Sequence, residues 1–279
     1  MSEHVLYLDP VQFRALRGRV VWHLRRHPER RRRYRRDGLT ISATLRLLLL
    51  AFRYNRTQRL LAAMFRVSQS TVCRALCWLR AILAQVLAAE ISAAGDAGAA
   101  LGRLLGQAEG RPVVVLIDGT LIPVADRFYD PLNYSGKHKR IGRSLQIVAD
   151  VAGKLLCAGP AAAGRLHDRL ALAQSGLGPL LKSDTRLLVH ADRGYIGSGF
   201  IVPALRPRHG RLSLAALAEN REISAIRHAV ERAIAHLKIL AILRTGLRTR
   251  SPHREQVITE TIAVALGLVF LRQKAGIQA

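Results

Sequence analysis

The chain has 279 residues, of which 49% are hydrophobic, and this is enough for one large domain or two smaller ones around a substantial core. Its 44 Lys and Arg residues against 19 Asp and Glu give a formal net charge of +25. Such a surplus opposes compaction by self-repulsion unless a polyanion offsets it, and it makes nucleic acid the natural partner. A GC-rich genome alone would not suppress acidic residues in this way.

Cysteine usage and hydropathy point away from a secreted or membrane protein. Cys73, Cys77 and Cys157 are an odd number of cysteines without metal-ligand spacing, which is typical of a reducing compartment. The N-terminus MSEHVLYLDP carries acids where a signal peptide needs bases, and the longest apolar run, Ile262 to Leu271, is too short to span a bilayer. We expect a soluble cytoplasmic, nucleoid-associated bacterial protein with no membrane partner.

Residues 1–100 are predicted to form a helical DNA-binding region. Residues 1–38 resemble a basic arm, since the segment Arg25 to Arg36 holds eight arginines and one glutamate. This segment is either a solvated tail or a contact with phosphates. Residues 39–87 are expected to form three helices, of which the first is capped by Ser42 and the second begins near Thr57. The third helix follows a corner at Arg66-Val67 and is capped by Ser68.

Residues 57–83 resemble a helix-turn-helix, with Arg66 where a turn glycine is common. The resemblance implies that the third helix is the recognition helix and that its first residues face the major groove. These residues are Gln69, Ser70, Thr71 and Arg74. An ordinary helical bundle is the alternative. The small and glycine-containing residues 88–110 indicate a linker or loose helix, and the domain boundary is placed there.

Residues 111–279 are predicted to form an α/β domain. Five apolar residues, Val113 to Ile117, indicate a buried strand that ends in Asp118, and Arg186 to His190 indicate another that closes on Asp192. Between them, strands turn at Ala152-Gly153 and a helix begins near His167-Asp168. A periodic helix from about Glu222 to Leu240 carries Glu231 beside its apolar stripe. The apolar stripe consists of Ile223, Ile226, Val230, Ile234 and Leu237.

Asp118, Asp192 and Glu231 are therefore expected to converge. Three carboxylates within about 4–6 Å repel one another by a few kcal/mol per pair at an effective dielectric of about 20, unless cations separate them. Hard oxygen ligands suit Mg²⁺ or Mn²⁺, and two such ions stabilise both oxygens of an in-line phosphoryl displacement. We therefore expect Asp118, Asp192 and Glu231 to be both catalytic residues and ligands of two Mg²⁺ or Mn²⁺ ions.

These motifs, in this order, resemble insertion-sequence transposases of the acidic-triad (DDE) superfamily, close to the Harbinger-like branch. The matching residues include Asp118-Gly119-Thr120, Tyr134 to Lys137, His167-Asp168, Asp192 to Tyr195, and Asn220. The last helix matches a Tyr-Arg-Glu-Lys signature as Ser224, Arg227, Glu231 and Lys238, with serine in place of tyrosine.

The resemblance implies an RNase H-like fold, a mixed sheet flanked by helices. It also implies a metal-dependent endonuclease and strand transferase that cuts transposon ends to a 3′-hydroxyl and joins them to target DNA. Such a protein would bind double-stranded DNA, at the element's ends and at the target, and would assemble as a homo-oligomer on it. Arg227, Lys238, Lys137 and Lys139 would hold DNA phosphates. Asp168 is interpreted as a helix cap beside a surface histidine, and not as a metal ligand.

Two other classes of protein share part of this pattern. A haloacid dehalogenase phosphatase begins Asp-x-Asp-Gly-Thr-Leu, but its nucleophilic aspartate corresponds to Leu116 here, and leucine cannot form an acyl phosphate. A non-catalytic or domesticated transposase-derived DNA-binding regulator stays open as the alternative function.

Overall fold

The computed structural model describes residues 7–30, 38–125, 130–248 and 253–275. It divides into two compact units, one of residues 1–92 with 237–279 and one of residues 93–236. The sequence grouped the C-terminal segment with the α/β domain, whereas the structure packs it with the N-terminal helices. Residues 31–36 of the arginine-rich segment lie outside the described residues, as does Tyr129.

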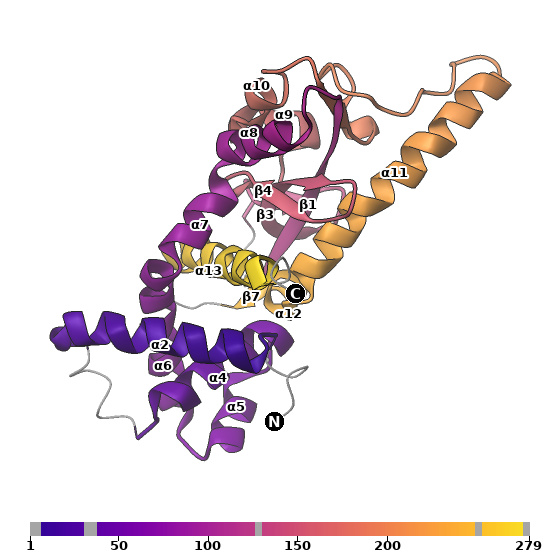
Figure 1. Cartoon of the computed structure of the whole chain (residues 1–279). Coiled ribbons are helices and arrows are strands. Elements are labelled where there is room, and N and C mark those ends of the chain that lie inside the picture. Colours follow the sequence, from indigo (N-terminus) through magenta and orange to yellow (C-terminus); the bar gives the residue numbers. More distant parts are fainter. Residues whose placement is uncertain (1–6, 31–37, 126–129, 249–252, 276–279) are drawn as a thin grey trace. The chain divides into compact units, whose positions relative to one another are not determined.

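The first unit is built mainly of helices (Figure 1). They are α2 (Pro10–Arg26), α4 (Ile41–Tyr54), α5 (Gln58–Phe65), α6 (Gln69–Val86), α12 (Ala241–Thr245) and α13 (Arg254–Ala275), with a two-residue strand β7 (Leu247–Arg248). The helix α4 contacts α2, α5, α6 and α12. Leu47, Leu48, Leu49 and Leu50 of α4 are all buried, so this helix packs against its neighbours on most of its surface, while Arg46 and Tyr54 stay exposed.

Polar side chains begin four of these helices, and Asp9 caps the first of them, α2. Thr40, Thr57 and Ser68 precede α4, α5 and α6, and each side-chain oxygen accepts a hydrogen bond from the backbone N–H three residues later. The predicted cap Ser68 is confirmed. The predicted cap Ser42 is wrong, because Thr40 starts the helix, and the Ser42 hydroxyl accepts a hydrogen bond from Arg17 Nε instead.

The corner between α5 and α6 lies where the sequence predicted it. Arg66 has φ 53° and ψ 45°, the left-handed conformation, and its N–H donates to the carbonyls that end α5. For a residue with a Cβ this conformation costs about 1 kcal/mol relative to glycine. The helices α5 and α6 pack against each other, with Val72 and Leu79 fully buried.

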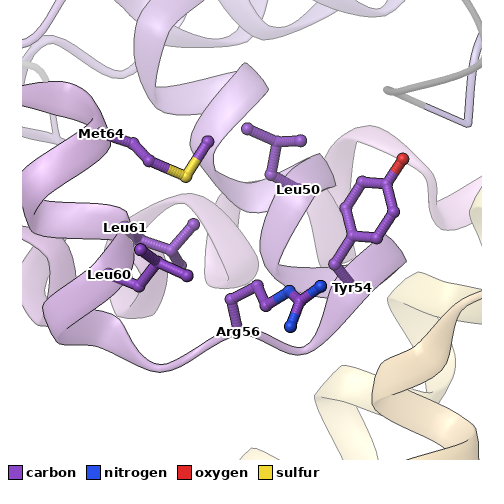
Figure 2. Close-up of a pocket in the computed structure, with 6 residues that line it drawn as sticks. All are labelled: Leu50, Tyr54, Arg56, Leu60, Leu61 and Met64. Atoms are coloured by element: carbon purple, nitrogen blue, oxygen red, sulfur yellow. The ribbon is translucent and has the colours of Figure 1, made fainter.

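An apolar hollow lies beside α4 and α5, where side chains of the two helices face one another (Figure 2). Its lining residues are Leu50, Tyr54, Arg56, Leu60, Leu61 and Met64. Leu60 and Met64 are about half exposed. These lining residues include no carboxylate, and the predicted catalytic residues Asp118, Asp192 and Glu231 belong to the other unit.

A mixed sheet forms the centre of the second unit. Its strands are β1 (Val113–Ala125), β2 (Tyr134–Ser135), β3 (Arg140–Asp150), β4 (Leu155–Ala158), β5 (Ala162–Ala163) and β6 (Leu187–His190). Strand β1 lies between antiparallel β3 and parallel β6, and β2, β4 and β5 pair with β3. The predicted turn between β3 and β4 is confirmed. Gly153 has φ 82° there, and a Cβ would lie 3.0 Å from the carbonyl of Ala229, so the turn requires glycine.

Helices flank this sheet (Figure 1). They are α8 (Ala97–Gln107), α9 (Asp168–Ser175), α10 (Leu177–Leu181), α11 (Leu214–Lys238) and the 3₁₀ turn η2 (Arg193–Tyr195), while α7 (Ala88–Gly95) crosses the boundary between the units. Side chains of α8, α9 and α10 share a core cluster with Val115 and Ile117 of β1. Of the two interpretations of residues 88–110, a linker or a loose helix, the helix is confirmed, and small residues such as Ala97 and Ala100 let α8 pack closely on the sheet.

No single helix within the described residues is long and apolar enough to cross a membrane. The pair α6 and α7 meets the criteria of length and composition only when the two helices are counted together across the break between them.

Candidate active site

Asp118 lies within β1, not at its end as the sequence predicted. The strand continues to Ala125, and Asp118 pairs with Ile147 of β3. The parallel ladder with β6, in contrast, ends where Leu116 pairs with His190. Asp118 therefore lies just beyond the end of the parallel ladder, while it is still held rigidly by β3.

Asp192 lies level with Asp118, in the segment that follows β6. Leu116 and His190 form the last pair of the ladder, and Asp118 and Asp192 each follow two residues later. Residues two apart in an extended chain point to the same side, so the register brings the two carboxylates together. Asp192 also caps η2, since its Oδ1 accepts a hydrogen bond from the Gly194 N–H at 2.8 Å.

The electrostatics of Asp118 reflect this crowding. Burial raises the pKa of Asp118 from 3.8 to about 6, and the nearby carboxylates of Asp192 and Asp168 also raise it. The Arg227 guanidinium and the N–H of Gly119 act in the opposite direction. The two predicted aspartates therefore interact, and Asp168 interacts with them.

Arg227 reaches the same place from α11. Its Nη2 lies 3.4 Å from Asp118 Oδ2, and both side chains are only 16% exposed. Its buried Nε has no hydrogen-bond partner among the described residues. Arg227 therefore does not lie on the exposed flank of α11, because the helix lays this position against Asp118 of β1.

Glu231 lies one helical turn after Arg227. Its side chain is 55% exposed, and its Oε2 lies 3.0 Å from Nδ1 of His228 on the same helix. The structure thus brings Asp118 and Asp192 together, whereas the contact that it gives Glu231 is local to α11. On the apolar stripe of this helix, Ile223, Val230 and Leu237 are buried and Ile226 and Ile234 are partly buried.

Asp168 is the carboxylate that the sequence predicted to be a helix cap, and that interpretation is wrong. The residue preceding α9 is His167, whose side chain makes no capping bond, and Asp168 is the first helical residue. A Cβ added to Gly119 would lie 2.4 Å from Asp168 Oδ1, and a Cβ added to Gly194 would lie 2.6 Å from Asp168 Oδ2. Lys137 Nζ lies 3.4 Å from that same Oδ2. The carboxylate of Asp168 therefore points toward the segments that carry Asp118 and Asp192.

A buried polar pair lies beside these carboxylates. The hydroxyl of Tyr195 donates to Oε1 of Gln146, and both side chains are shielded from solvent. Burial raises the pKa of Tyr195 well above its ordinary value, and Asp168, Asp118 and Asp192 raise it further. The Nε2 of Gln146 has no partner among the described residues.

The donor chemistry fits a hard divalent cation, because aspartate oxygens are the ligands that Mg²⁺ and Mn²⁺ prefer. Within the described ranges, however, no group of three His, Cys, Asp or Glu side chains is arranged so that it could hold a metal ion. Two of the aspartates are instead paired with basic side chains, Asp118 with Arg227 and Asp168 with Lys137. Protein cations thus balance part of the negative charge.

The predicted phosphate-binding lysines lie in different surroundings. Lys137 is 64% exposed and sits in the turn between β2 and β3. Lys139 is exposed in the same turn, with φ 50°. Lys238 is half-buried near the end of α11.

The predicted recognition residues begin α6 in the helical unit. Gln69, Ser70 and Arg74 are exposed. Thr71 differs, since it is 8% exposed and its backbone N–H and hydroxyl both bond to the cap Ser68. Thr71 therefore stabilises the start of the helix and is not on its exposed face.

Two of three comparisons with known proteins give a match. A family model described as DDE superfamily endonuclease matches residues 117–269, a range that includes Asp118, Asp168, Asp192 and Glu231. The chain is 30% identical over 241 residues to a protein of Streptomyces albus G that is assigned as a transposase for insertion sequence element IS112. That alignment covers 85% of this chain and 83% of the relative. No solved structure gives a significant match.

Proposed function

Because this chain belongs to the insertion-sequence transposases of the DDE endonuclease superfamily, we propose that it cuts the ends of a mobile element and joins them to target DNA. The observation that carries this proposal is the register of β1 and β6, which sets Asp118 and Asp192 side by side at the end of a parallel ladder. Two crowded aspartates, one within a rigid strand and one just after its neighbour, are suited to binding cations that activate phosphodiesters.

We propose Asp118, Asp192 and Glu231 as the catalytic carboxylates that hold two Mg²⁺ or Mn²⁺ ions. When bound, such ions polarise the scissile phosphate and stabilise the attacking and leaving oxygens. Among the described residues, the half-exposed side chain of Glu231 pairs with His228 on the surface of α11, so a change of rotamer is inexpensive. The strand β3 fixes Asp118, and the turn η2 fixes Asp192, so that both are already oriented before substrate arrives.

Arg227, Lys238, Lys137 and Lys139 are proposed to hold DNA phosphates near the cut. The buried Nε of Arg227 supports this role, because a guanidinium with an unused donor next to Asp118 can donate to a phosphate oxygen in the fork geometry that arginine favours. Desolvation on closure around DNA would strengthen that contact.

The α/β unit is proposed to have an RNase H-like fold. The strand order β4-β3-β1-β6, with β6 parallel and β3 antiparallel to β1 and helices α8 to α11 around the sheet, supports this interpretation. Asp118 lies in the central strand, and Asp192 follows the adjacent parallel strand. These are positions where a sheet of this kind would carry its active site.

The helical unit is proposed to be a helix-turn-helix that recognises the element's ends. The short α5, the left-handed corner at Arg66 and the exposed Gln69, Ser70 and Arg74 at the start of α6 support this. Two ends must be brought together for transposition, so we propose a homo-oligomer assembled on DNA. Arg74→Ala should weaken binding to cognate ends by about 1–3 kcal/mol and relax discrimination.

The test uses the full-length chain, DNA that carries the terminal repeats flanking the gene, and Mg²⁺. Asp118→Ala, Asp192→Ala and Glu231→Ala should each abolish cleavage while DNA binding and circular dichroism stay unchanged. Near-wild-type cleavage by any one variant would remove that residue from the triad. If the wild-type chain binds the repeats but does not cut them with either Mg²⁺ or Mn²⁺, the protein is a DNA-binding regulator and the catalytic proposal is wrong.

A further inference from the structure

The exposed face of α2 carries a tryptophan. Trp22 is 56% exposed, whereas Phe13 and Leu16 of the same helix are buried, and the helix contacts α4, α6 and α13. The chain has one other tryptophan, Trp78, which is partly buried and donates its indole N–H to the carbonyl of Arg30 at 3.1 Å. A single exposed ring is ordinary by itself, so the surroundings of Trp22 decide what its exposure means.

The surroundings of Trp22 are strongly basic. From Pro10 to Arg26, α2 holds five arginines and no acidic residue. One of them, Arg19, pairs with Glu90 at 2.8 Å. The other four are exposed, and they are Arg14, Arg17, Arg25 and Arg26. Because residues three and four apart on a helix are neighbours, Arg25 and Arg26 flank the tryptophan, and such a rim attracts a polyanion.

Arg26 orders the tryptophan ring without covering it. The guanidinium carbon of Arg26 lies 3.9 Å from the ring centroid of Trp22, which is a cation–π contact. More than half of the Trp22 surface is still exposed. A ring that is already held in place loses little conformational freedom when a ligand stacks on it. An ordered ring beside guanidinium groups is suited to single-stranded nucleic acid, since a base stacks on the ring and the cations contact the phosphates.

Gly18 leaves the surface open one turn before Trp22. Among the described residues, and apart from the backbone of α2 and the two chain neighbours of Gly18, no heavy atom lies within 4 Å of a Cβ placed there. Glycine is a poor residue for the interior of a helix, because it gives less stability than alanine. Here it leaves space for a flat ligand beside the ring.

We propose that α2 binds single-stranded DNA, with an unpaired base stacked on Trp22 and the adjoining phosphates held by Arg25 and Arg26. The inference deepens the proposed function, on which it rests for the presence of DNA, because a strand that is cut and transferred is unpaired near the break. It gives the helical unit a second partner besides the duplex of the element's ends. Stacking tolerates every base, so this site would hold a strand of any sequence.

Two other partners suit this face less well. In a dimer formed through α2, five arginines of one copy would lie against five of the other and repel them. A bilayer surface requires a broad apolar face, whereas the large apolar residues exposed on α2 are Val11 and Trp22, near opposite ends of the helix. Single-stranded DNA supplies both the flat base and the negative charge that this face lacks.

The first experiment uses the full-length protein, with EDTA present so that no strand is cut, and a labelled oligodeoxythymidylate whose affinity is measured by fluorescence anisotropy. Trp22→Ala should lower the affinity by about ten- to one-hundredfold, the loss of one stacked base, and Trp22→Phe should retain most of it. Val11→Ala is the matched control, because Val11 is the other large apolar residue exposed on α2, and it should leave the affinity unchanged.

The emission of Trp22 reports stacking directly. In Trp78→Phe, Trp22 is the only tryptophan, so unlabelled oligodeoxythymidylate should quench its fluorescence as the strand binds. This variant loses the bond to the Arg30 carbonyl, and circular dichroism checks that it is folded. If it does not fold, the difference in quenching between wild type and Trp22→Phe gives the same readout. Binding of the strand without any quenching of Trp22 overturns the inference.

Gly18→Leu separates binding from a purely structural role, in which Trp22 and Arg26 only stabilise the end of α2. Leucine is a better helix former than glycine, so this variant should unfold at a higher urea concentration. Its side chain would nevertheless occupy the space beside the ring and should lower the affinity for the strand by about tenfold. Unchanged affinity in Gly18→Leu, with a loss of stability alone in Trp22→Ala, would establish the structural role and overturn the inference.

Duplex DNA and self-association complete the test. If Trp22→Ala weakens binding of a blunt duplex as much as binding of the single strand, α2 is a general phosphate contact and the inference is wrong. It is also wrong if Trp22→Ala dissociates an oligomer in analytical ultracentrifugation without DNA. A protein that cuts the terminal repeats without quenching of Trp22 by the strand contradicts the inference alone, whereas quenching without cleavage contradicts only the proposed function.

Discussion

Replacing Asp118 with asparagine should stabilise the metal-free protein. Asp118 has a pKa of about 6 in the folded chain and 3.8 in the unfolded one, because burial disfavours its charge. At about 1.4 kcal/mol per pKa unit, the charged side chain destabilises the fold by about 3 kcal/mol above pH 6. The asparagine avoids this cost but weakens the pair with Arg227, so we expect a net gain of about 1–2 kcal/mol at pH 7.5.

The sign of the pH dependence follows from the direction of the shift. The folded state binds the Asp118 proton more tightly, so its contribution to stability is fully present below pH 4 and is lost as pH rises through 6. The stabilisation by Asp118→Asn should therefore be small near pH 4 and reach its full size above pH 6. An equal difference between wild type and variant at pH 4 and pH 7.5 would refute the reasoning.

The assay is urea denaturation with EDTA present, followed by circular dichroism. Tryptophan fluorescence is unsuitable, because Trp22 and Trp78 both belong to the helical unit and do not report on β1.

Asp184→Asn provides the opposite control. Hydrogen bonds from Arg186 lower the pKa of Asp184 to about 2, so its contribution is present above pH 4 and is lost on acidification. That variant should be less stable than wild type at pH 7.5.

Three further predictions concern single residues. Arg66→Gly should stabilise the helical unit by about 1 kcal/mol in urea denaturation, because glycine adopts the left-handed conformation of the corner without a steric cost, and a loss of stability would contradict it. Ser68→Ala should destabilise the same unit by about 1 kcal/mol through loss of the α6 cap, whereas Ser70→Ala should not. Arg227→Ala should raise the pKa of Asp118 further, which carboxylate NMR measures, and an unchanged pKa would show that the ion pair is not formed in solution.

Local patterns in the sequence were sufficient for much of the molecule. The β-branched run before Asp118 and the apolar run before Asp192 specified buried strands, and Ser68 after the Arg66 corner specified where α6 begins. These features depend on neighbouring residues only, through backbone sterics, capping bonds and the alternation of side chains along a strand. The acidic motifs Asp118-Gly119 and Asp192-Arg193-Gly194 are likewise local, and in order with the other motifs they indicated the family.

Only the tertiary structure decided which side chains meet. The sequence does not contain the register in which Leu116 pairs with His190, and that register sets Asp118 level with Asp192. Nor does helical periodicity tell which flank of α11 faces the sheet, and only the structure shows that Arg227 lies against Asp118. The local surroundings of Asp168 suit a helix cap, and they do not reveal its neighbours in space. The two glycines that admit its carboxylate come from distant segments, and contacts between distant segments depend on how the whole chain packs.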